Sequence, residues 1–281
     1  MKNHRGLKIF GIVALSVVLF FVIINVIPPK KNVDENPFIV GEGKLPMIAA
    51  HRGGGENNPE NTMLAFREAV NTIGVDIIES DLYLTKDGYL VYNHDGYIDR
   101  TSNVNGDVTE KEVLAICGDK QRRHYIKDMT LAELEEYNFG YFFKDENGER
   151  IYKDETDIEG AGLQIATVDE LFSEFYESHP DLYRGAPTGT AAAFILTQFL
   201  GVNIFDGGDF ACLQIPMSYD LGIEINLESK SIINRAHRRN IAVQYWTIND
   251  PDEMRRLIEL GCDCIMTDNP KLLKEVLEEY K

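Results

Sequence analysis

From residue 47 onward, short runs of strand-forming residues alternate with stretches of helical character, and this alternation most constrains the fold. The run MIAAH (47–51) predicts a strand, and the segment 60–73 predicts a helix with Pro59 near its start. We expect further strands at 75–84 and 182–186 and an apolar helix at about 190–200. Late in the chain we expect strands at 211–215, 241–248 and 262–268. Regular strand–loop–helix alternation is typical of a parallel α/β fold.

Polar side chains end several of the predicted strands. His51 and Arg52 follow the first strand, and an adjacent imidazole and guanidinium suit an anionic oxygen substrate. Glu79 and Asp81 stand two residues apart on a strand, so both carboxylates project from one face and repel each other unless a cation lies between them. Oxygen ligands favour Mg²⁺ or Ca²⁺ over zinc. With His94 as a second imidazole, the pattern indicates metal-dependent phosphoryl transfer.

Each of these residues also has a simpler interpretation. A histidine at a strand end is often an ordinary hydrogen-bonded residue, and a Glu-x-Asp pair is usually a solvated strand face. The segment Glu60-Asn61-Thr62 is also typical of a helix opening. What favours a catalytic site is the coincidence of several polar residues on successive strand ends, because β/α barrels build their chemistry there.

Several short blocks of the body resemble one known family. In chain order they are His51-Arg52-Gly53, Pro59-Glu60-Asn61-Thr62, Asp76-Ile77-Ile78-Glu79-Ser80-Asp81, Thr85-Lys86-Asp87-Gly88, His94-Asp95, Asp99-Arg100-Thr101, Trp246-Thr247-Ile248-Asn249 and Thr267-Asp268-Asn269-Pro270. Together they resemble the glycerophosphodiester phosphodiesterase family, and the resemblance covers most of residues 46–280.

The resemblance implies a TIM-like (β/α) barrel that hydrolyses glycerophosphodiesters to glycerol 3-phosphate and an alcohol with a divalent metal, Ca²⁺ or Mg²⁺. Within that family, His51 and His94 resemble the acid/base pair, and Glu79 and Asp81 resemble two metal-binding carboxylates. One imidazole would deprotonate the glycerol 2-hydroxyl for attack on phosphorus, and the other would protonate the departing alkoxide.

The resemblance also implies contacts to the substrate. Arg52 resembles a phosphate-binding residue that would offset the charge developing in the reaction, and Glu60 belongs to the same predicted substrate site. Trp246 resembles an aromatic residue of the substrate pocket.

The chain departs from the family pattern after the helix predicted at 168–178. The family has there a strand of the Ile-Glu-Ile-Lys type, whose Glu is a third metal ligand, and then a further strand–helix unit. Here the chain runs directly into 179–185, which resembles the sixth strand, so we expect an incomplete barrel without the fourth and fifth strands. Glu224 lies in a segment that imitates the lost strand but comes just before the Trp246 block. Two alternatives remain, namely an active phosphodiesterase and a catalytically impaired or binding-only member of the family.

The N-terminal stretch 7–27 is apolar, with no charge after Lys8, and about 1.5 Å per residue makes it long enough for a hydrocarbon core of about 30 Å. It predicts a transmembrane signal anchor rather than a cleaved signal peptide, whose apolar part is shorter. A buried globular helix is a further alternative. Basic residues are more numerous before the stretch than after it, which favours an inside N-terminus and an extracellular catalytic domain at the cell membrane.

The predicted organisation is therefore a short tail (1–6), an anchor (7–27), a polar tether (28–44) and a barrel domain (45–281). The polar segment from 99 to 164 predicts either a lid over the pocket or surface decoration.

Charge and cysteine spacing exclude other classes of protein. With 28 basic and 46 acidic residues the net charge is −18, and a body this acidic repels polyphosphate, which excludes nucleic acid as a partner. The four cysteines match no zinc spacing, so we expect buried thiols at Cys117, Cys212, Cys262 and Cys264.

Overall fold

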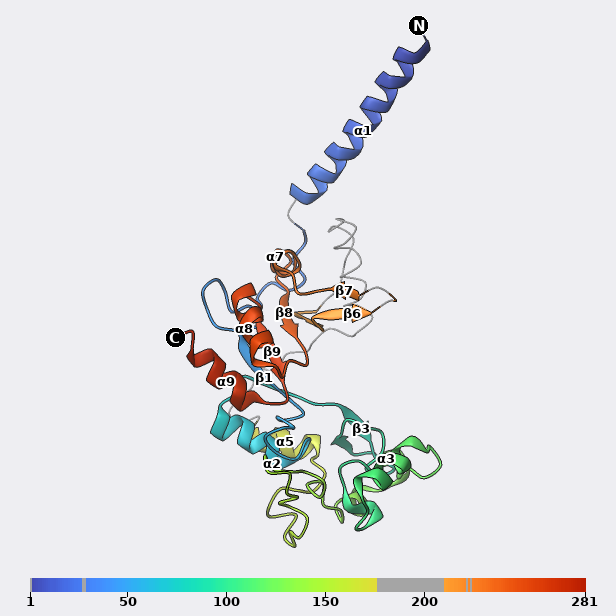
Figure 1. The fold of residues 1–281 in the computed structure, drawn as a ribbon, viewed down its shortest axis with the longest axis vertical. Coiled ribbons are helices and arrows are strands. Elements are labelled where there is room, and N and C mark those ends of the chain that lie inside the picture. Colours follow the sequence, from blue (N-terminus) through green and yellow to red (C-terminus); the bar gives the residue numbers. More distant parts are fainter. Residues whose placement is uncertain (1, 27–28, 176–209, 221, 223) are drawn as a thin grey trace. The chain divides into compact units, whose positions relative to one another are not determined.

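The structure, a computed structural model, describes residues 2–26, 29–175, 210–220, 222 and 224–281. The chain forms two compact units, whose elements carry the labels of Figure 1. Unit 1 comprises residues 1–46, 183–246 and 257–264, and unit 2 comprises residues 47–182, 247–256 and 265–281.

Unit 2 contains most of the predicted strand–helix pattern. Its elements are β1 (Met47–His51), α2 (Met63–Arg67) continued by a π-helix (Glu68–Ile73), β2 (Ile77–Glu79), β3 (Leu82–Leu84), β4 (Leu90–Tyr92), α3 (Glu110–Gly118), α4 (Leu131–Leu134), α5 (Val168–Phe175) and α9 (Pro270–Glu278). In addition, α8 (Pro251–Leu260) begins in unit 2 and β9 (Cys264–Thr267) ends in it.

Strand β1 is central in the sheet of unit 2, between β2 and β9. It pairs in parallel with β2 in a register that sets His51 beside Glu79, and the prediction of a strand at 47–51 is confirmed. The predicted strand at 75–84 is divided in two, because β3 turns away from β2 and pairs antiparallel with β4, with Leu82 opposite Tyr92. The short link between β3 and β4 cannot hold a crossover helix, and it forms a hairpin instead.

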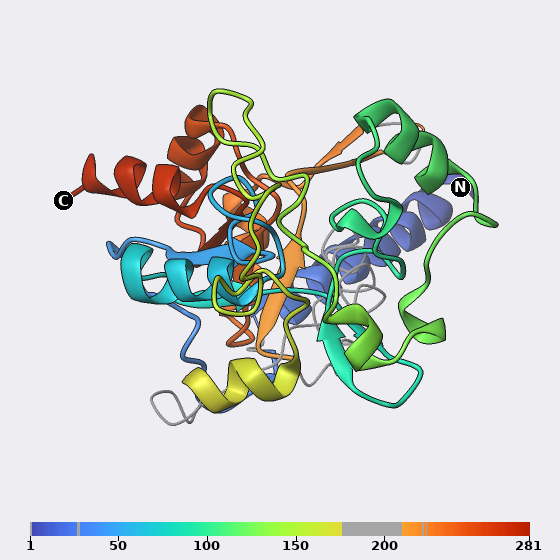
Figure 2. The same ribbon diagram turned by 90° about the horizontal axis from the view of Figure 1, so that it is seen from below.

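Two clusters of buried apolar side chains stabilise this part of unit 2. One joins α2 to β4 through Met63, Phe66 and Tyr92, and the rings of Phe66 and Tyr92 meet edge to face at 5.3 Å. Residues of α5, including Leu171 and Phe175, pack against the same cluster, and Figures 1 and 2 show α2 and α5 side by side. The second cluster has six buried members: Val91, Ile98, Ile126, Leu134, Phe139 and Ile165.

Unit 1 contains a second parallel pair. Strand β5 (Cys212–Ile215) runs parallel to β8 (Ala242–Tyr245), and β6 (Ser218–Asp220) forms a hairpin with β7 (Glu224–Asn226). Helix α7 (Lys230–His237) precedes β8, and α1 (Lys2–Val26) is the first element of the chain. The parallel pairs in both units confirm the α/β part of the predicted fold. The strand predicted at 182–186, the helix predicted at 190–200 and the expected site of the missing barrel strands lie outside the described residues.

The segment 32–40 is hydrogen-bonded to the rest of unit 1. The Asn36 side chain donates to the carbonyl oxygens of Ala211 and Asn240, at 2.6 and 2.7 Å. Asn240 donates in return to the carbonyl oxygens of residues 33 and 34. The Val40 amide donates to Asp263, a fully buried carboxylate that also accepts from His237 at 2.7 Å. These bonds satisfy buried polar groups of the unit.

The predicted membrane location is wrong. Crossing a bilayer requires about 20 consecutive apolar residues, and within the described residues no helix is long and apolar enough to do so. The predictions of a transmembrane helix at 7–27, of a membrane partner and of an extracellular catalytic domain lose their support with that finding. Three of the four cysteines, Cys212, Cys262 and Cys264, are buried thiols as predicted, whereas Cys117 is partly exposed.

Candidate active site

His51 ends β1 between two carboxylates. Its Nδ1 lies 2.5 Å from Oδ1 of Asp268, which directly follows β9, and its Nε2 lies 3.8 Å from Oε2 of Glu79 at the end of β2. Because three neighbouring strands end here, their last side chains meet at one edge of the sheet, as expected of an α/β site. The Asp268 contact orients the ring so that Nε2 faces Glu79.

Asp268 is itself fixed by Asn249. The Asn249 amide nitrogen donates to Oδ2 of Asp268 at 2.7 Å, and its oxygen accepts from the Asp268 amide at 2.9 Å. Burial alone would raise the pKa of Asp268, but the hydrogen bonds from His51 and Asn249 and the charge of Arg52 lower this pKa below its ordinary value. Asp268 is therefore ionised at neutral pH and favours a proton on Nδ1 of His51, which leaves Nε2 free to accept one.

The other carboxylate, Glu79, has one oxygen without a hydrogen-bond donor among the described residues. This oxygen, Oε2, is buried. Burial raises the pKa of Glu79, and the nearby charge of Asp81 raises it further, against the opposing effect of His51. A divalent cation between Glu79 and Asp81 would remove both penalties, so these residues fit such an ion. In the described part of the chain, no group of three or more His, Cys, Asp or Glu residues forms a complete metal cluster.

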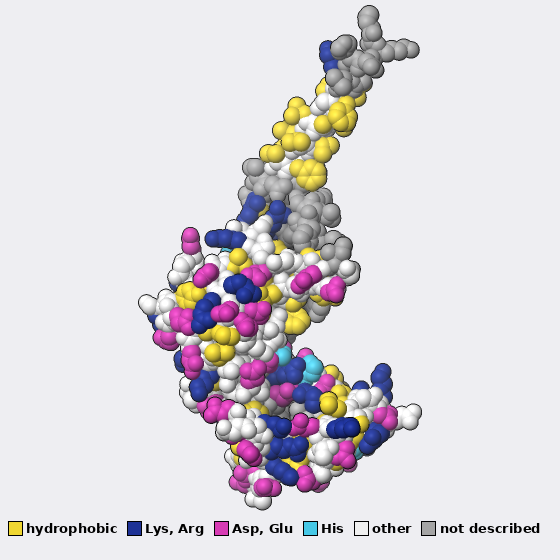
Figure 3. All heavy atoms as spheres, in the orientation of Figure 1, with side chains coloured by type: hydrophobic (Ala, Val, Ile, Leu, Met, Phe, Trp, Pro, Cys, Tyr) yellow, Lys and Arg dark blue, Asp and Glu magenta, His cyan; other side chains and the backbone are white. Residues whose placement is uncertain are grey.

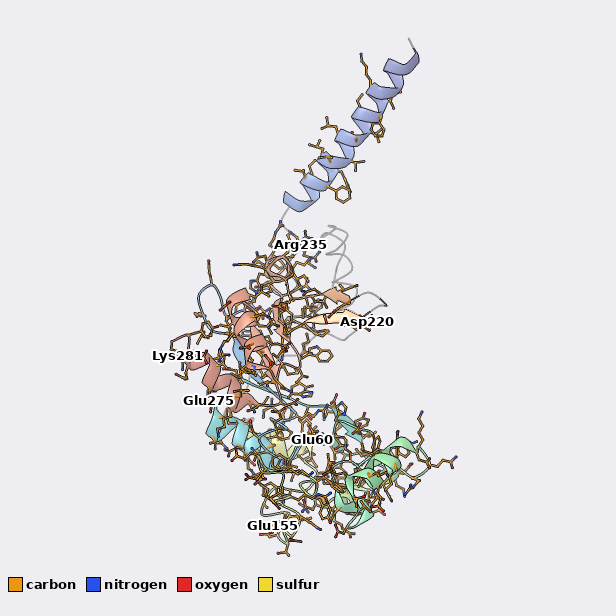
Figure 4. The ribbon with its side chains drawn as sticks, viewed as in Figure 1. Glu60, Glu155, Asp220, Arg235, Glu275 and Lys281 are labelled. Carbon is orange, nitrogen blue, oxygen red and sulfur yellow. The ribbon has the colours of Figure 1, made fainter. Side chains whose placement is uncertain are left out.

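A series of contacts between ionisable side chains, called the charged row below, connects Arg52 to His94 through Glu60, Arg100 and Asp95. Arg52 Nη1 lies 3.3 Å from Oε2 of Glu60, and Arg100 contacts both oxygens of Glu60, at 2.5 and 3.0 Å. Arg100 Nε also donates to Oδ2 of Asp95 at 2.6 Å, and the second oxygen of Asp95 lies 3.3 Å from Nδ1 of His94. The positions of the phosphate-binding candidate and of the second imidazole are therefore coupled through one series of ion pairs (Glu60 is labelled in Figure 4).

Glu60 and Arg100 hold each other in their charged states. Burial alone would raise the pKa of Glu60, but Arg100 and Arg52 lower it below its ordinary value. Burial opposes the charge on Arg100, whereas Glu60 and Asp95 raise the pKa of its guanidinium. The Arg52 Nε atom is buried and lacks a hydrogen-bond partner among the residues described, so the guanidinium retains a donor for an anion. Visible histidine side chains in Figure 3 lie against Lys, Arg, Asp and Glu side chains.

The turn after β1 brings the backbone close to α2. Arg52 has φ +55° and Gly53 has φ +82°, both in the left-handed region that non-glycine residues rarely adopt. A Cβ on Gly53 would lie 2.8 Å from Cδ1 of Phe66 and 3.0 Å from Cβ of Ala65. Glycine is therefore required at position 53 by both conformation and space, and this tight turn lets Arg52 follow His51 into the site.

The structure brings most of the predicted site residues into one unit. His51, Arg52, Glu60, Glu79, Asp81 and His94 all belong to unit 2. Trp246 follows β8 in unit 1, where 41% of its surface is exposed, and Glu224 belongs to the exposed β6–β7 hairpin of the same unit. Sequence reasoning assigned no role to four further residues of the site: Asp95, Arg100, Asn249 and Asp268. All four stood in the recognised blocks, and two of them end predicted strands, which was the available signal.

A cavity of about 960 Å³ adjoins this site within unit 2. It shares Glu60 and Arg100 with the charged row, but neither predicted catalytic histidine lines it. Its other walls come from the segment after β1, the start of α9 and the loop 139–151.

A comparison with protein families identifies the chain. The model of the glycerophosphoryl diester phosphodiesterase family matches residues 51–191 and 210–272, which is more than half of the chain. The chain belongs to this family. The match includes every site residue described above, from His51 to Asp268.

Other members of this phosphodiesterase family align over most of the chain. A glycerophosphodiester phosphodiesterase of Caldanaerobacter subterraneus is 29% identical over 264 aligned positions, which cover 81% of this chain and 96% of the relative. One of Bacillus subtilis is 24% identical and covers all of both chains. The alignment with the Caldanaerobacter relative has 264 positions, but 81% of the 281 residues of this chain is fewer than 264. The alignment therefore contains gaps in this chain, where the relative has additional residues.

Solved structures support the TIM-like fold of the phosphodiesterase. The phosphodiesterase domain of an uncharacterised Mycobacterium tuberculosis protein superposes with a TM-score of 0.61 at 15% identity, covering 83% of this chain and 99% of that one. An Oleispira antarctica phosphodiesterase, solved with the product sn-glycerol-3-phosphate, superposes with a TM-score of 0.52 at 18% identity, covering 83% and 97%. The predicted family, its enzyme class and the TIM-like character of the fold are thus confirmed.

Proposed function

We propose that this phosphodiesterase hydrolyses glycerophosphodiesters to glycerol 3-phosphate and an alcohol, with His51 and His94 transferring the protons. The observation that carries the proposal is the position of His51, whose Nδ1 is engaged by Asp268 at 2.5 Å while Nε2 faces the carboxylate of Glu79. An imidazole oriented in this way acts as a general base on a substrate hydroxyl beside it.

The first step forms one bond to phosphorus and breaks another. Nε2 of His51 accepts the proton of the glycerol 2-hydroxyl, whose oxygen attacks phosphorus. The bond from phosphorus to the alcohol oxygen breaks, and His94 protonates that oxygen. Water then opens the cyclic phosphate with the proton transfers reversed, which yields glycerol 3-phosphate and restores both imidazoles.

Arg52, Glu79 and Asp81 would stabilise the negative charge that develops on the phosphate during this reaction. The unpaired Nε of Arg52, within the described set of contacts, supports its role as a donor to the phosphate oxygens. Glu79 and Asp81 would hold Ca²⁺ or Mg²⁺, which would supply electrostatic stabilisation for the phosphorane-like charge. Glu60 serves the substrate indirectly in this proposal, because its two arginine contacts fix where Arg52 lies.

The test measures glycerol 3-phosphate released from glycerophosphocholine by the full chain with Ca²⁺, with Mg²⁺ and with EDTA. We expect turnover that EDTA abolishes and that His51→Ala lowers by about 10²- to 10⁴-fold. The matched control is His124→Ala, since His124 also contacts an aspartate, Asp99 at 2.8 Å, but lies outside the charged row. Equal losses in both variants, with equal unfolding temperatures, would refute the role of His51.

A binding-only function is the second candidate. The gaps in the alignment with the Caldanaerobacter relative favour it, because this chain lacks residues that the relative has, and the resemblance implies that a strand with a third metal carboxylate is among the lost parts. A well-folded chain that binds glycerol 3-phosphate in calorimetry but turns over no diester would support this candidate over the first.

A further inference from the structure

We propose that the cavity beside Glu60 and Arg100 receives the alcohol part of the diester and selects a cationic alcohol, of the quaternary ammonium or amine type. The inference rests on the proposed function, which it deepens by naming the class of leaving group. Three features of the cavity carry it: its connection to the charged row, the charge balance of its wall and its aromatic side chains.

The cavity is connected to the phosphate-binding candidate through a shared wall. Glu60 lines the cavity and contacts Arg52 at 3.3 Å, and Arg100 lines the cavity and contacts Glu60. A phosphate held by Arg52 therefore lies one side chain away from this space. At about 960 Å³, the volume is sufficient for a small alcohol and its hydration, since ligand pockets range from roughly 300 to 1,000 Å³.

The wall of the cavity carries more carboxylates than cations. Five acidic side chains line it, namely Glu56, Glu60, Asp145, Glu146 and Glu275, against the three basic side chains Arg100, Lys144 and Lys271. Arg100 and Glu60 neutralise each other, and Lys144 pairs with Glu110 outside the cavity, so four carboxylates remain against Lys271. The remaining field is negative, which favours a cationic group over a neutral or anionic one.

The aromatic side chains are the third feature of the cavity. Phe139, Phe142 and Phe143 line the cavity from the loop 139–151, and their π faces attract cations. The protein already uses one of them in this way, because the guanidinium of Arg150 lies 4.6 Å from the ring centroid of Phe142. Carboxylates combined with aromatic rings are the chemistry that recognises a quaternary ammonium group.

One lining side chain also lacks a partner. Thr101 is 9% exposed, and its Oγ1 has no hydrogen-bond partner among the residues that the structure describes. Thr101 follows Arg100 directly and lines the cavity, so a water that hydrates the cationic group would satisfy this hydroxyl. An acyl chain has no polar group that could hydrogen-bond to the Thr101 hydroxyl, which favours a polar occupant of the cavity over the tail of a lysolipid.

The kinetic test compares glycerophosphocholine with glycerophosphoglycerol, which carry a cationic and a neutral alcohol. Glu146→Gln combined with Glu275→Gln removes two wall charges (Glu275 is labelled in Figure 4) without touching the charged row. We expect the double variant to raise KM for glycerophosphocholine about threefold to tenfold and to leave kcat and the glycerophosphoglycerol kinetics unchanged. Glu149→Gln is the matched control, because Glu149 belongs to the same loop but does not line the cavity.

Calorimetric titration with free choline separates the two proposals. Choline binding that the double variant weakens and Glu149→Gln preserves supports the cavity assignment, even if neither diester is hydrolysed and the proposed function fails. Hydrolysis of both diesters with equal effects of the double variant on each, and with no choline binding, overturns the inference while the proposed function stands. A preference for lysophosphatidylcholine that Phe142→Ala abolishes and the double variant leaves intact overturns it in favour of an acyl site.

Discussion

The guanidinium of Arg100 donates two hydrogen bonds to the carboxylate of Glu60, with Nη2 2.5 Å from Oε1 and Nη1 3.0 Å from Oε2. This bidentate pair connects the block that opens α2 to the block that follows His94. Because Arg100 also contacts Asp95, it holds two loops that carry candidate reacting groups. We propose that it positions Arg52 and His94, because it contacts Glu60 and Asp95, which contact those two side chains in turn.

Arg100→Gln should lower activity mainly through KM. Without Arg100, Glu60 keeps only Arg52 as a cationic partner and draws its charge from the phosphate, so we expect KM for the diester to rise about tenfold with a smaller change in kcat. The broken, partly buried pair should also lower the free energy of unfolding by about 1–3 kcal/mol. Both are measured by steady-state kinetics and by urea titration.

Arg255→Gln is the control for that variant. Arg255 also contacts both oxygens of a glutamate, Glu279, and a further aspartate, but this cluster is exposed on α8 and α9. Its removal should leave kinetics unchanged and stability nearly so, because exposed ion pairs contribute little. Matching losses in the two variants would show that the Arg100 cluster has no positioning role.

Asp268→Asn should give a stability loss that depends on pH. A carboxylate whose folded-state pKa is lowered stabilises the fold above its unfolded pKa, near about 3.9, and loses that contribution as the pH falls through the folded pKa. We expect the variant to unfold at a lower temperature than the native chain at about pH 6–8, and the difference to shrink below about pH 4. A difference that stayed constant from about pH 7 to about pH 3 would contradict this origin.

Metal binding should stabilise the chain through Glu79. If Ca²⁺ or Mg²⁺ binds the folded state, a concentration of about 100 times Kd adds about 2.7 kcal/mol to the free energy of unfolding. The unfolding temperature of the native chain should rise with added metal, and that of Glu79→Gln should not. Glu224→Gln, on the exposed β7 strand, should respond as the native chain does. Loss of the metal response in Glu224→Gln would instead identify Glu224 as a ligand.

Gly53→Ala should destabilise unit 2 by more than its backbone strain alone. Gly88→Ala provides the comparison, because Gly88 has φ +94° yet an added methyl group there would meet nothing within 4 Å, whereas the methyl at position 53 meets Phe66. Strain costs about 1–2 kcal/mol at either position, and the clash at Gly53 adds roughly 1–3 kcal/mol. Equal unfolding free energies for the two variants would show that the turn relaxes away from α2.

The sequence predicted the elements that form by local pattern and missed relationships that depend on the turns between them. The β1 prediction was correct because MIAAH is a buried apolar run ended by a polar residue. The 75–84 run does hold polar residues at its break, Glu79-Ser80-Asp81, but composition does not show that the pairing changes there from parallel β2 to antiparallel β3. Likewise, nothing in the spacing of Glu60 and Arg100 indicates that they meet, since they are 40 residues apart.

The hydrogen bonds of the segment 32–40 affect where this chain can be shortened. The family match begins at residue 51, so a shortened protein would naturally start near residue 45. Such a cut would remove the Val40 donor from Asp263 and the Asn36 side chain from Ala211 and Asn240, and would thereby strip capping groups from the edge of unit 1. A protein that starts near residue 45 should consequently have less stable β5 and β8 strands, although both lie far along the chain from the removed segment.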